Sequence, residues 1–184
     1  MFMTDASDRY RANAAGFDAR VVAVPADRWE NQSPCEDWTA RDVVRHVVDT
    51  SGMFLGFVDQ KLPPAPSADE DPVAAWRSAR DAIQRALEDP QVAQMEYDGM
   101  LGKATFEQGV HKFLAPDALV HTWDLARATG LDDTLPEKAS QDVLEALEPM
   151  DDKMRGPGKF GDKIEPPPNA DVQTRLLCFL GRQP

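Results

Sequence analysis

The stretch DALVHTWDLARATG (117–130) decides how this sequence is interpreted. It predicts a helix that ends at Gly130, a residue type typical of helix C-termini. Asp117 and His121 are four residues apart, so both point to the same side of that helix. Apolar residues share this side, which predicts that it faces a core. Because an unpaired charge in a core is strongly disfavoured, both side chains need partners.

Upstream of this stretch, the same amphipathic pattern predicts further helices. The capping box TFEQ (105–108) extends the fourth helix back to about residue 105. Apolar residues at spacings of three and four predict earlier helices over about 5–24, from 39 to the Pro-rich loop at 61–72, and over about 72–89. The Asp98-Gly99 pair predicts at most a short hairpin between about 92 and 105.

Downstream, TLPE (134–137) opens a shorter helix that ends near Met150, and DVQTRLLCFLG (171–181) forms a last one. Four long helices followed by two short ones predict an all-α fold. We expect one domain over 1–184: a four-helix bundle at about 5–130 and a C-terminal helical extension at 131–184.

The charge balance excludes some classes of partner. Lys and Arg number 20 against 32 Asp and Glu, a net charge of -12. This charge repels phosphate backbones and anionic lipids, so we expect neither nucleic acid nor a membrane as partner. The N-terminus lacks the pattern of a secretory signal. Cys35 and Cys178 have no metal-knuckle spacing, which favours a reduced, cytoplasmic protein.

Three polar residues on buried helix faces indicate a metal site. His46 lies on the inner side of the second helix, so it can converge with Asp117 and His121 on one divalent ion. Three protein ligands leave coordination positions open for water or substrate. The alternative is a plain hydrogen bond between Asp117 and His121 beside a satisfied core histidine. His111 precedes Asp117 by six residues, about 240° around the helix, so it should face elsewhere.

The cysteine and tryptophan residues near these positions have simpler interpretations. Cys35 is either a nucleophile beside the metal or a packed thiol, and packing is favoured. Trp38 and Trp123 are either pocket walls or core residues, and core is favoured for each.

Two arginines are expected to be structural. Arg127 follows Asp124 closely enough on the fourth helix for an ion pair between them. Arg182 comes just after the last helix, where a solvated charge is favoured over an anion-binding role.

Three segments together resemble the DinB/YfiT-like superfamily: SPCEDWTARDVVRH (33–46), DALVHTWDLARATG (117–130) and RLLCFLGRQP (175–184). More narrowly, they resemble short actinobacterial proteins related to the metal-binding domain of mycothiol-dependent maleylpyruvate isomerase. The resemblance implies a four-helix bundle that holds a divalent metal, Zn²⁺ or another ion such as Ni²⁺. His46, Asp117 and His121 would be its ligands.

The resemblance also implies a reaction class. Family members include isomerases and S-transferases that use a low-molecular-weight thiol, so we expect this thiol and a small electrophile as substrates. The sequence departs from the isomerase in having Asp117 where the isomerase has Glu, and in lacking its C-terminal domain. Pro116, just before Asp117, should kink the helix. Two alternative functions stay open: a metal-dependent hydrolase and a non-catalytic module that binds a metal or a small ligand. The oligomeric state, monomer or homodimer, also stays open.

Overall fold

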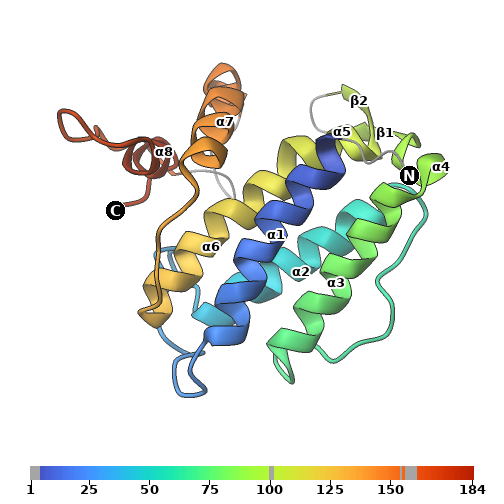
Figure 1. Ribbon diagram of the computed structural model, residues 1–184, viewed down its shortest axis with the longest axis horizontal. Coiled ribbons are helices and arrows are strands. Elements are labelled where there is room, and N and C mark those ends of the chain that lie inside the picture. The colour runs from blue at the N-terminus through green and yellow to red at the C-terminus, as the bar shows by residue number, and fades with distance from the viewer. Residues whose placement is uncertain (1–4, 100–101, 154, 156–160) are drawn as a thin grey trace.

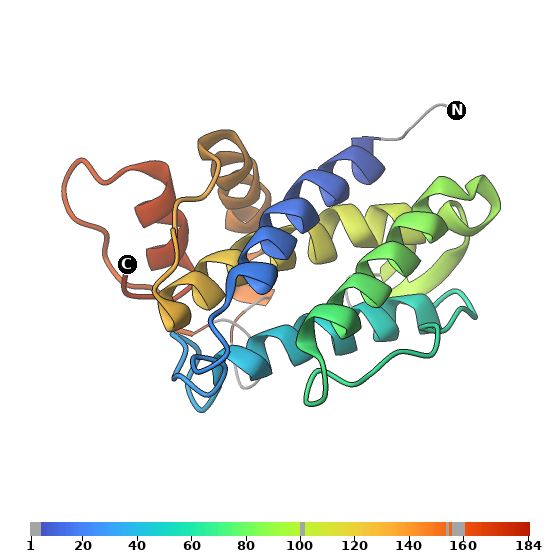
Figure 2. The same ribbon diagram turned by 60° about the horizontal axis from the view of Figure 1, so that its bottom comes forward.

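A computed structural model describes residues 5–99, 102–153, 155 and 161–184, and it confirms the all-α prediction. Four long helices pack side by side as a bundle, with two shorter helices beyond one of its faces (Figures 1 and 2). Among the described residues, no helix is long and apolar enough to cross a bilayer. The bundle helices are α1 (Asp5–Ala23), α2 (Ala40–Gly56), α3 (Pro72–Glu88) and α6 (Ala115–Thr129).

The bundle helices are arranged so that α1 and α2 each contact both α3 and α6. Helices α1 and α6 run in one direction and α2 and α3 in the other, so the loop after α2 returns along the outside of the bundle (Figure 1). This arrangement places the inner faces of α2 and α6 against each other. His46 on α2 and Asp117 on α6 are therefore close in space although they are 71 residues apart.

Local sequence signals set the helix ends. The Thr39 side chain accepts a hydrogen bond from the Asp42 backbone N–H, and the Asp42 carboxylate accepts one from the Thr39 backbone N–H, a capping box that opens α2. Asp71 caps α3 immediately before Pro72, and a proline is well tolerated at this first helical position. Gly130 ends α6 with a φ of 69°, the left-handed conformation that glycine adopts at low cost.

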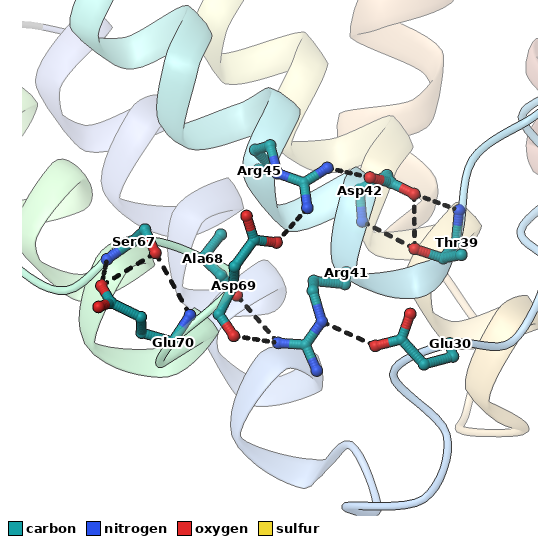
Figure 3. A network of polar contacts seen from close by, with 9 residues as sticks. All are labelled: Glu30, Thr39, Arg41, Asp42, Arg45, Ser67, Ala68, Asp69 and Glu70. Atoms are coloured by element: carbon teal, nitrogen blue, oxygen red, sulfur yellow. Dashed lines mark hydrogen bonds and ion pairs between the residues drawn. The ribbon is translucent and has the colours of Figure 1, made fainter.

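A polar network fastens the loop after α2 to the first turn of that helix (Figure 3). Arg41 donates to the backbone carbonyls of Ala68 and Asp69, at 3.0 and 3.1 Å. Arg45 pairs with the carboxylates of Asp42 and Asp69. These contacts hold the N-terminal part of α2 in place, one turn before His46.

The bundle core follows the predicted apolar faces. On α1, Tyr10, Ala14, Phe17 and Val21 have the spacing of three and four that predicts an apolar face, and all four are buried, while Val24 at the end of this face is partly buried. Trp76 of α3 is fully buried and meets the Phe17 ring edge-on, with 4.9 Å between ring centroids. Aromatic pairs of this geometry add about 0.5–1.5 kcal/mol to the effect of burial.

The segment between α3 and α6 contains the predicted hairpin. Its two strands pair antiparallel, with Tyr97 opposite Ala104, and they are the only strands among the described residues. Asp98 and Gly99, which were predicted to form the turn, lie in β1 opposite Lys103 and Gly102. Residues 100–101, between the two strands, lie outside the described residues. The elements of this segment are α4 (Pro90–Ala93), β1 (Glu96–Gly99), β2 (Gly102–Thr105), α5 (Phe106–Gly109) and the π-helix η1 (Val110–Leu114).

The fourth predicted helix is helical throughout, but it is not a uniform α-helix. Its backbone runs from α5 through the π-helical turn η1 into α6. Pro116 has no N–H to donate to the carbonyl of Lys112, and the N–H of Ala115 donates to Val110, one residue further back than in an α-helix. The kink predicted at Pro116 therefore takes the form of a π-helical turn directly before this residue.

The C-terminal extension covers the outer side of α6. It consists of α7 (Glu137–Leu147), the 3₁₀-helix η2 (Glu148–Lys153) and α8 (Val172–Phe179). Leu119 and Trp123 of α6 pack with Leu144 and Leu176 from α7 and α8 in a second apolar cluster. Because α6 is covered by the bundle on one side and by the extension on the other, most of its residues are buried.

Candidate metal centre

The structure brings together the three side chains expected to bind a metal. Asp117 Oδ1 lies 3.4 Å from His46 Nε2 and 3.3 Å from His121 Nε2. One atom from each of the three residues lies within 4.8 Å of the other two. Helix α2 supplies His46, and α6 supplies the other two from consecutive turns of one face. The convergence inferred from the separate helices is thus present.

The contacts of His121 constrain its protonation. Its Nδ1 lies 2.9 Å from Asp124 Oδ2, a distance at which the imidazole donates to the carboxylate. In a neutral ring, Nε2 then carries a lone pair, and this lone pair faces the Asp117 carboxylate oxygen. Two acceptors at 3.3 Å repel each other unless a cation or a proton lies between them. This geometry therefore demands positive charge between His121 and Asp117.

Asp117 has spare capacity as a ligand. Its second oxygen, Oδ2, is buried and has no hydrogen-bond partner among the described residues. Burial raises the pKa of this carboxyl group, but the charge and hydrogen bond of His121 lower it further, so the net pKa lies well below its usual value. An ionised carboxylate with a buried free oxygen, beside two imidazoles, is a donor set that suits Zn²⁺ and similar divalent ions.

A buried ion pair stands behind His121, and it corrects two expectations. Asp124 does not pair with Arg127, which contacts Asp133 instead at 3.2 Å. Asp124 pairs with Arg182, whose side chain is only 13% exposed and is therefore not a solvated terminal charge. The reason is tertiary: the chain after α8 folds back toward α6. Asp124 could have been found from its spacing, because it lies three residues after His121 on the same face.

Cys35 and Trp38, from the loop between α1 and α2, line the cluster. Cys35 Sγ is 3.5 Å from Asp124 Oδ2 and 3.7 Å from Arg182 Nη2. Cys35, His121 and Asp124 also form a second group of potential ligands. The half-buried thiol thus belongs to a polar cluster and is not the apolar packing residue that was favoured.

The two tryptophans differ from each other. The ring of Trp38 is half-buried and lies against both imidazoles, with centroids 4.8 Å from His46 and 6.0 Å from His121. It therefore forms a wall of the candidate site, and it also packs against the bundle core, the interpretation that was favoured. Trp123, by contrast, is buried in the cluster between α6 and the extension, as expected.

A small cavity opens beside the cluster. Its volume is about 140 Å³, and Asp117, His121 and Arg182 line it together with apolar and neutral side chains from α2, α6 and α7. Lys112 contributes the second cation of its wall. This space is large enough for a few non-hydrogen atoms of a ligand next to the carboxylate.

His111 lies away from this cluster, as its position on the helix predicts. Its Nε2 contacts Arg9 of α1 at 3.3 Å, and it lines a separate, larger cavity near the hairpin. The cavity at His111, of about 580 Å³, is therefore distinct from the one beside the candidate ligands and larger than it.

The fold and the site together define a class: a four-helix bundle with a histidine–carboxylate cluster between two of its helices. Comparison with protein families shows which family within this class the chain belongs to. The family described as Mycothiol maleylpyruvate isomerase N-terminal domain matches residues 10–126. The chain belongs to this family, and the match includes His46, Asp117 and His121 but not Arg182.

Two individual relatives match nearly the whole chain. The chain is 30% identical over 168 residues to "Uncharacterized protein Rv0738" of Mycobacterium tuberculosis strain H37Rv, covering 90% of this chain and 91% of the relative. "Uncharacterized protein MT0763" of strain CDC 1551 matches with the same values. The similarity therefore extends beyond the bundle into the C-terminal extension.

A solved structure shares the fold. It is the crystal structure of a histidine-to-alanine mutant of the mycothiol-dependent maleylpyruvate isomerase, with a TM-score of 0.61 and 12% sequence identity. The superposition covers 86% of this chain and 75% of the other. At this identity the likeness establishes the fold alone.

Proposed function

We propose that His46, Asp117 and His121 bind one divalent metal ion, most simply Zn²⁺, and that the protein uses this site in an S-transfer or isomerisation reaction with a low-molecular-weight thiol. One observation carries the metal proposal: His121 Nε2 lies 3.3 Å from Asp117 Oδ1, a contact that needs positive charge, while Oδ2 of the same carboxylate is buried without a partner among the described residues. A single cation satisfies all of these atoms at once.

The thiol is supported by the description of the matching family and by that of the solved structure with the same fold. Both the matching family and the solved structure with the same fold are described by mycothiol and maleylpyruvate isomerase. A divalent ion in such a site supplies positive charge that favours the thiolate form of a thiol over its protonated form. The departures at Asp117 and in the C-terminal region leave the electrophile to be identified by experiment.

The protein's own residues prepare the site in three ways. Asp124 accepts the Nδ1 proton of His121, which fixes the tautomer and leaves Nε2 free as a ligand atom. Trp38 covers one side of both imidazoles and limits the access of water. Lys112 lines the cavity beside Asp117, where its ammonium group can pair with the carboxylate of an anionic electrophile.

The volume of the cavity restricts the reaction. At about 140 Å³, the space beside Asp117 accommodates a sulfur atom and a small part of the electrophile, so the rest of both substrates must extend outward. We infer substrates that present a narrow reacting end. A cytoplasmic location also stays part of the proposal, supported by the free thiols of Cys35 and Cys178.

The test combines metal analysis with a paired activity screen. The purified protein is assayed for bound metal, and the metal-loaded form is then incubated with small thiols and electrophilic alkenes or alkyl halides. A parallel screen without thiol uses esters and amides. Metal-dependent, thiol-dependent turnover supports the proposal. Turnover only without thiol supports a hydrolase instead, and metal binding without turnover in either screen supports a non-catalytic binding module.

A further inference from the structure

A second cavity, of about 580 Å³, lies between α1, the hairpin and the π-helix η1. Its volume is typical of sites for small organic molecules. Lys112 and Phe113 line both this cavity and the smaller one, whereas Asp117 and His121 line only the smaller. The larger cavity is therefore a separate space next to the candidate metal centre, and nothing proposed above uses it.

Two buried polar atoms of its walls have no hydrogen-bond partner among the described residues: Arg9 Nη2 and Glu107 Oε2. A buried donor or acceptor without a partner costs about 1–3 kcal/mol, and more when the group is charged. The guanidinium group can only donate, and an ionised carboxylate can only accept. Two charged side chains of the cavity walls, one that can only donate and one that can only accept, are thus not fully hydrogen-bonded among the described residues.

The Arg9 guanidinium group is held in place by a neighbour. Its Nη1 lies 3.3 Å from His111 Nε2, and because arginine can only donate, His111 accepts through a lone pair. Burial, followed by the positive charge of Arg9, lowers the pKa of His111, so the ring is neutral in this contact. The Arg9 guanidinium group is therefore fixed in the cavity wall, where it can act only as a donor.

The charges around the cavity favour an anion with an additional donor group. Lys103 and Lys112 join Arg9 in the walls, against the carboxylates of Asp5 and Glu107. In a chain with a net charge of -12, an excess of cations around one cavity is an exception. Without these cations, the net negative charge of the chain would repel anions from the cavity.

Part of the wall is apolar. The rings of Tyr97 and Phe113 line the cavity, and three alanines from α1, β2 and α7 complete this side. Such a wall favours a ligand with an apolar body, because covering aromatic surface removes it from water and is favourable.

We propose that this cavity binds a small carboxylic acid that carries an apolar body and an amino or hydroxyl group. The carboxylate accepts a hydrogen bond from Arg9, the amino or hydroxyl group donates one to Glu107, and the apolar body packs on Tyr97 and Phe113. This inference does not rest on the metal centre.

The test is calorimetric titration of the full-length protein in the presence of a metal chelator. L-phenylalanine and L-phenyllactate are the complete probes, 3-phenylpropanoate lacks the donor group, and phenethylamine lacks the carboxylate. We expect the complete probes to bind with a Kd of about 1 mM or tighter. Loss of the donor group should weaken binding about tenfold, the effect of one hydrogen bond to a charged group. Phenethylamine should not bind.

Four variants locate the site. Arg9→Gln should abolish binding of all three acids. Glu107→Gln should weaken L-phenylalanine but leave 3-phenylpropanoate unchanged, and this second probe shows that the variant is folded. Arg77→Gln, a surface arginine of α3 that pairs with Asp18, is the matched control and should bind like the wild type. His46→Ala should also retain binding.

Any one of three results would overturn the proposal. The first is that neither complete probe binds the wild-type protein. The second is that Arg9→Gln leaves the affinity unchanged, and the third is that Glu107→Gln weakens every acid equally. The titration is carried out without metal and includes the His46→Ala variant, so failure of this proposal leaves the proposed metal function unaffected. Failure of the metal proposal likewise leaves this one unaffected.

Discussion

Arg182 donates to both carboxylate oxygens of Asp124, from Nε at 2.8 Å and from Nη2 at 2.7 Å. Asp124 is fully buried, and its Oδ2 also accepts from His121 Nδ1. Burial raises the pKa of Asp124, but the His121 hydrogen bond and the Arg182 charge outweigh this effect, bringing it to about 2. The ion pair therefore connects the end of the chain to the imidazole of a proposed metal ligand.

Removing one partner of this ion pair should destabilise the protein. Arg182→Leu leaves the Asp124 carboxylate buried with only His121 and the weakly donating Cys35 thiol as partners, and breaking such a pair costs about 3–5 kcal/mol. Urea unfolding of the metal-free protein measures this loss. The double variant Asp124→Asn/Arg182→Leu should lose less than the sum of the single variants, because it leaves no charge unpaired. Additive losses would show that the two residues do not depend on each other.

The metal centre should contain one divalent ion per chain. His46→Ala and His121→Ala each remove one of three ligands, so tight binding should be lost in both. His111→Ala is the control, because His111 contacts Arg9 and lies away from the candidate ligands. Elemental analysis after dialysis gives the stoichiometry. If all three variants lost metal equally, the assignment of His46 and His121 as ligands would be wrong.

Much of the fold can be predicted because its signals are local. The capping boxes at Thr39 and Thr105 and the helix end at Gly130 each act within a few residues, and the structure contains all three. The predicted hairpin is also present, but Asp98 and Gly99 lie in β1 opposite Lys103 and Gly102 and do not form its turn. The π-turn before Pro116 was expected only as a kink. The kink takes the form of a π-helical turn because the N–H of Ala115 bonds to the carbonyl of Val110. Packing around the whole segment decides which carbonyl this N–H reaches.

The site could be predicted in part for a related reason. Asp117 and His121 share a helix face by spacing alone, and His46 required only that its own face be buried. The role of Arg182 could not be inferred, because it depends on how the chain after α8 returns across α6. The periodic pattern of apolar residues carries no information about the course of such a segment. The mistaken Asp124–Arg127 pair came from the same limit: proximity in sequence was preferred over an unknown tertiary contact.

The capping box of α2 should make stability depend on pH. The side-chain hydrogen bond from Thr39, and then its backbone N–H, lower the pKa of Asp42 below its usual value. A carboxyl group with a lowered folded-state pKa contributes its stabilisation above the unfolded value, about 4, and loses it as the pH falls through the folded value.

Asp42→Ala should therefore cost about 1 kcal/mol at neutral pH, a common effect of losing a helix cap. The difference from the wild type should shrink below about pH 4. Urea unfolding at a series of pH values tests this, with Asp71→Ala as the matched cap of α3. A difference that stayed constant down to the lowest pH of the folded protein would show that the Asp42 charge is not involved.

Asp124 should also strengthen metal binding although it is not one of the three proposed ligands. It accepts the Nδ1 proton of His121 at 2.9 Å, which makes Nε2 a better donor to a cation and keeps the ring in the required orientation. Asp124→Asn keeps the size of the side chain but removes its charge, so metal affinity should fall about 10- to 100-fold. Competition with a chromophoric chelator measures the change.

Two further variants make the result decisive. Asp117→Asn removes a proposed ligand oxygen and should weaken binding more than Asp124→Asn does. Asp133→Asn alters the surface carboxylate that pairs with Arg127, and its affinity should equal that of the wild type. Urea unfolding of each variant separates loss of affinity from loss of fold. Wild-type affinity in a folded Asp124→Asn protein would restrict Asp124 to its ion pair with Arg182 and would show that His121 does not need it to bind metal.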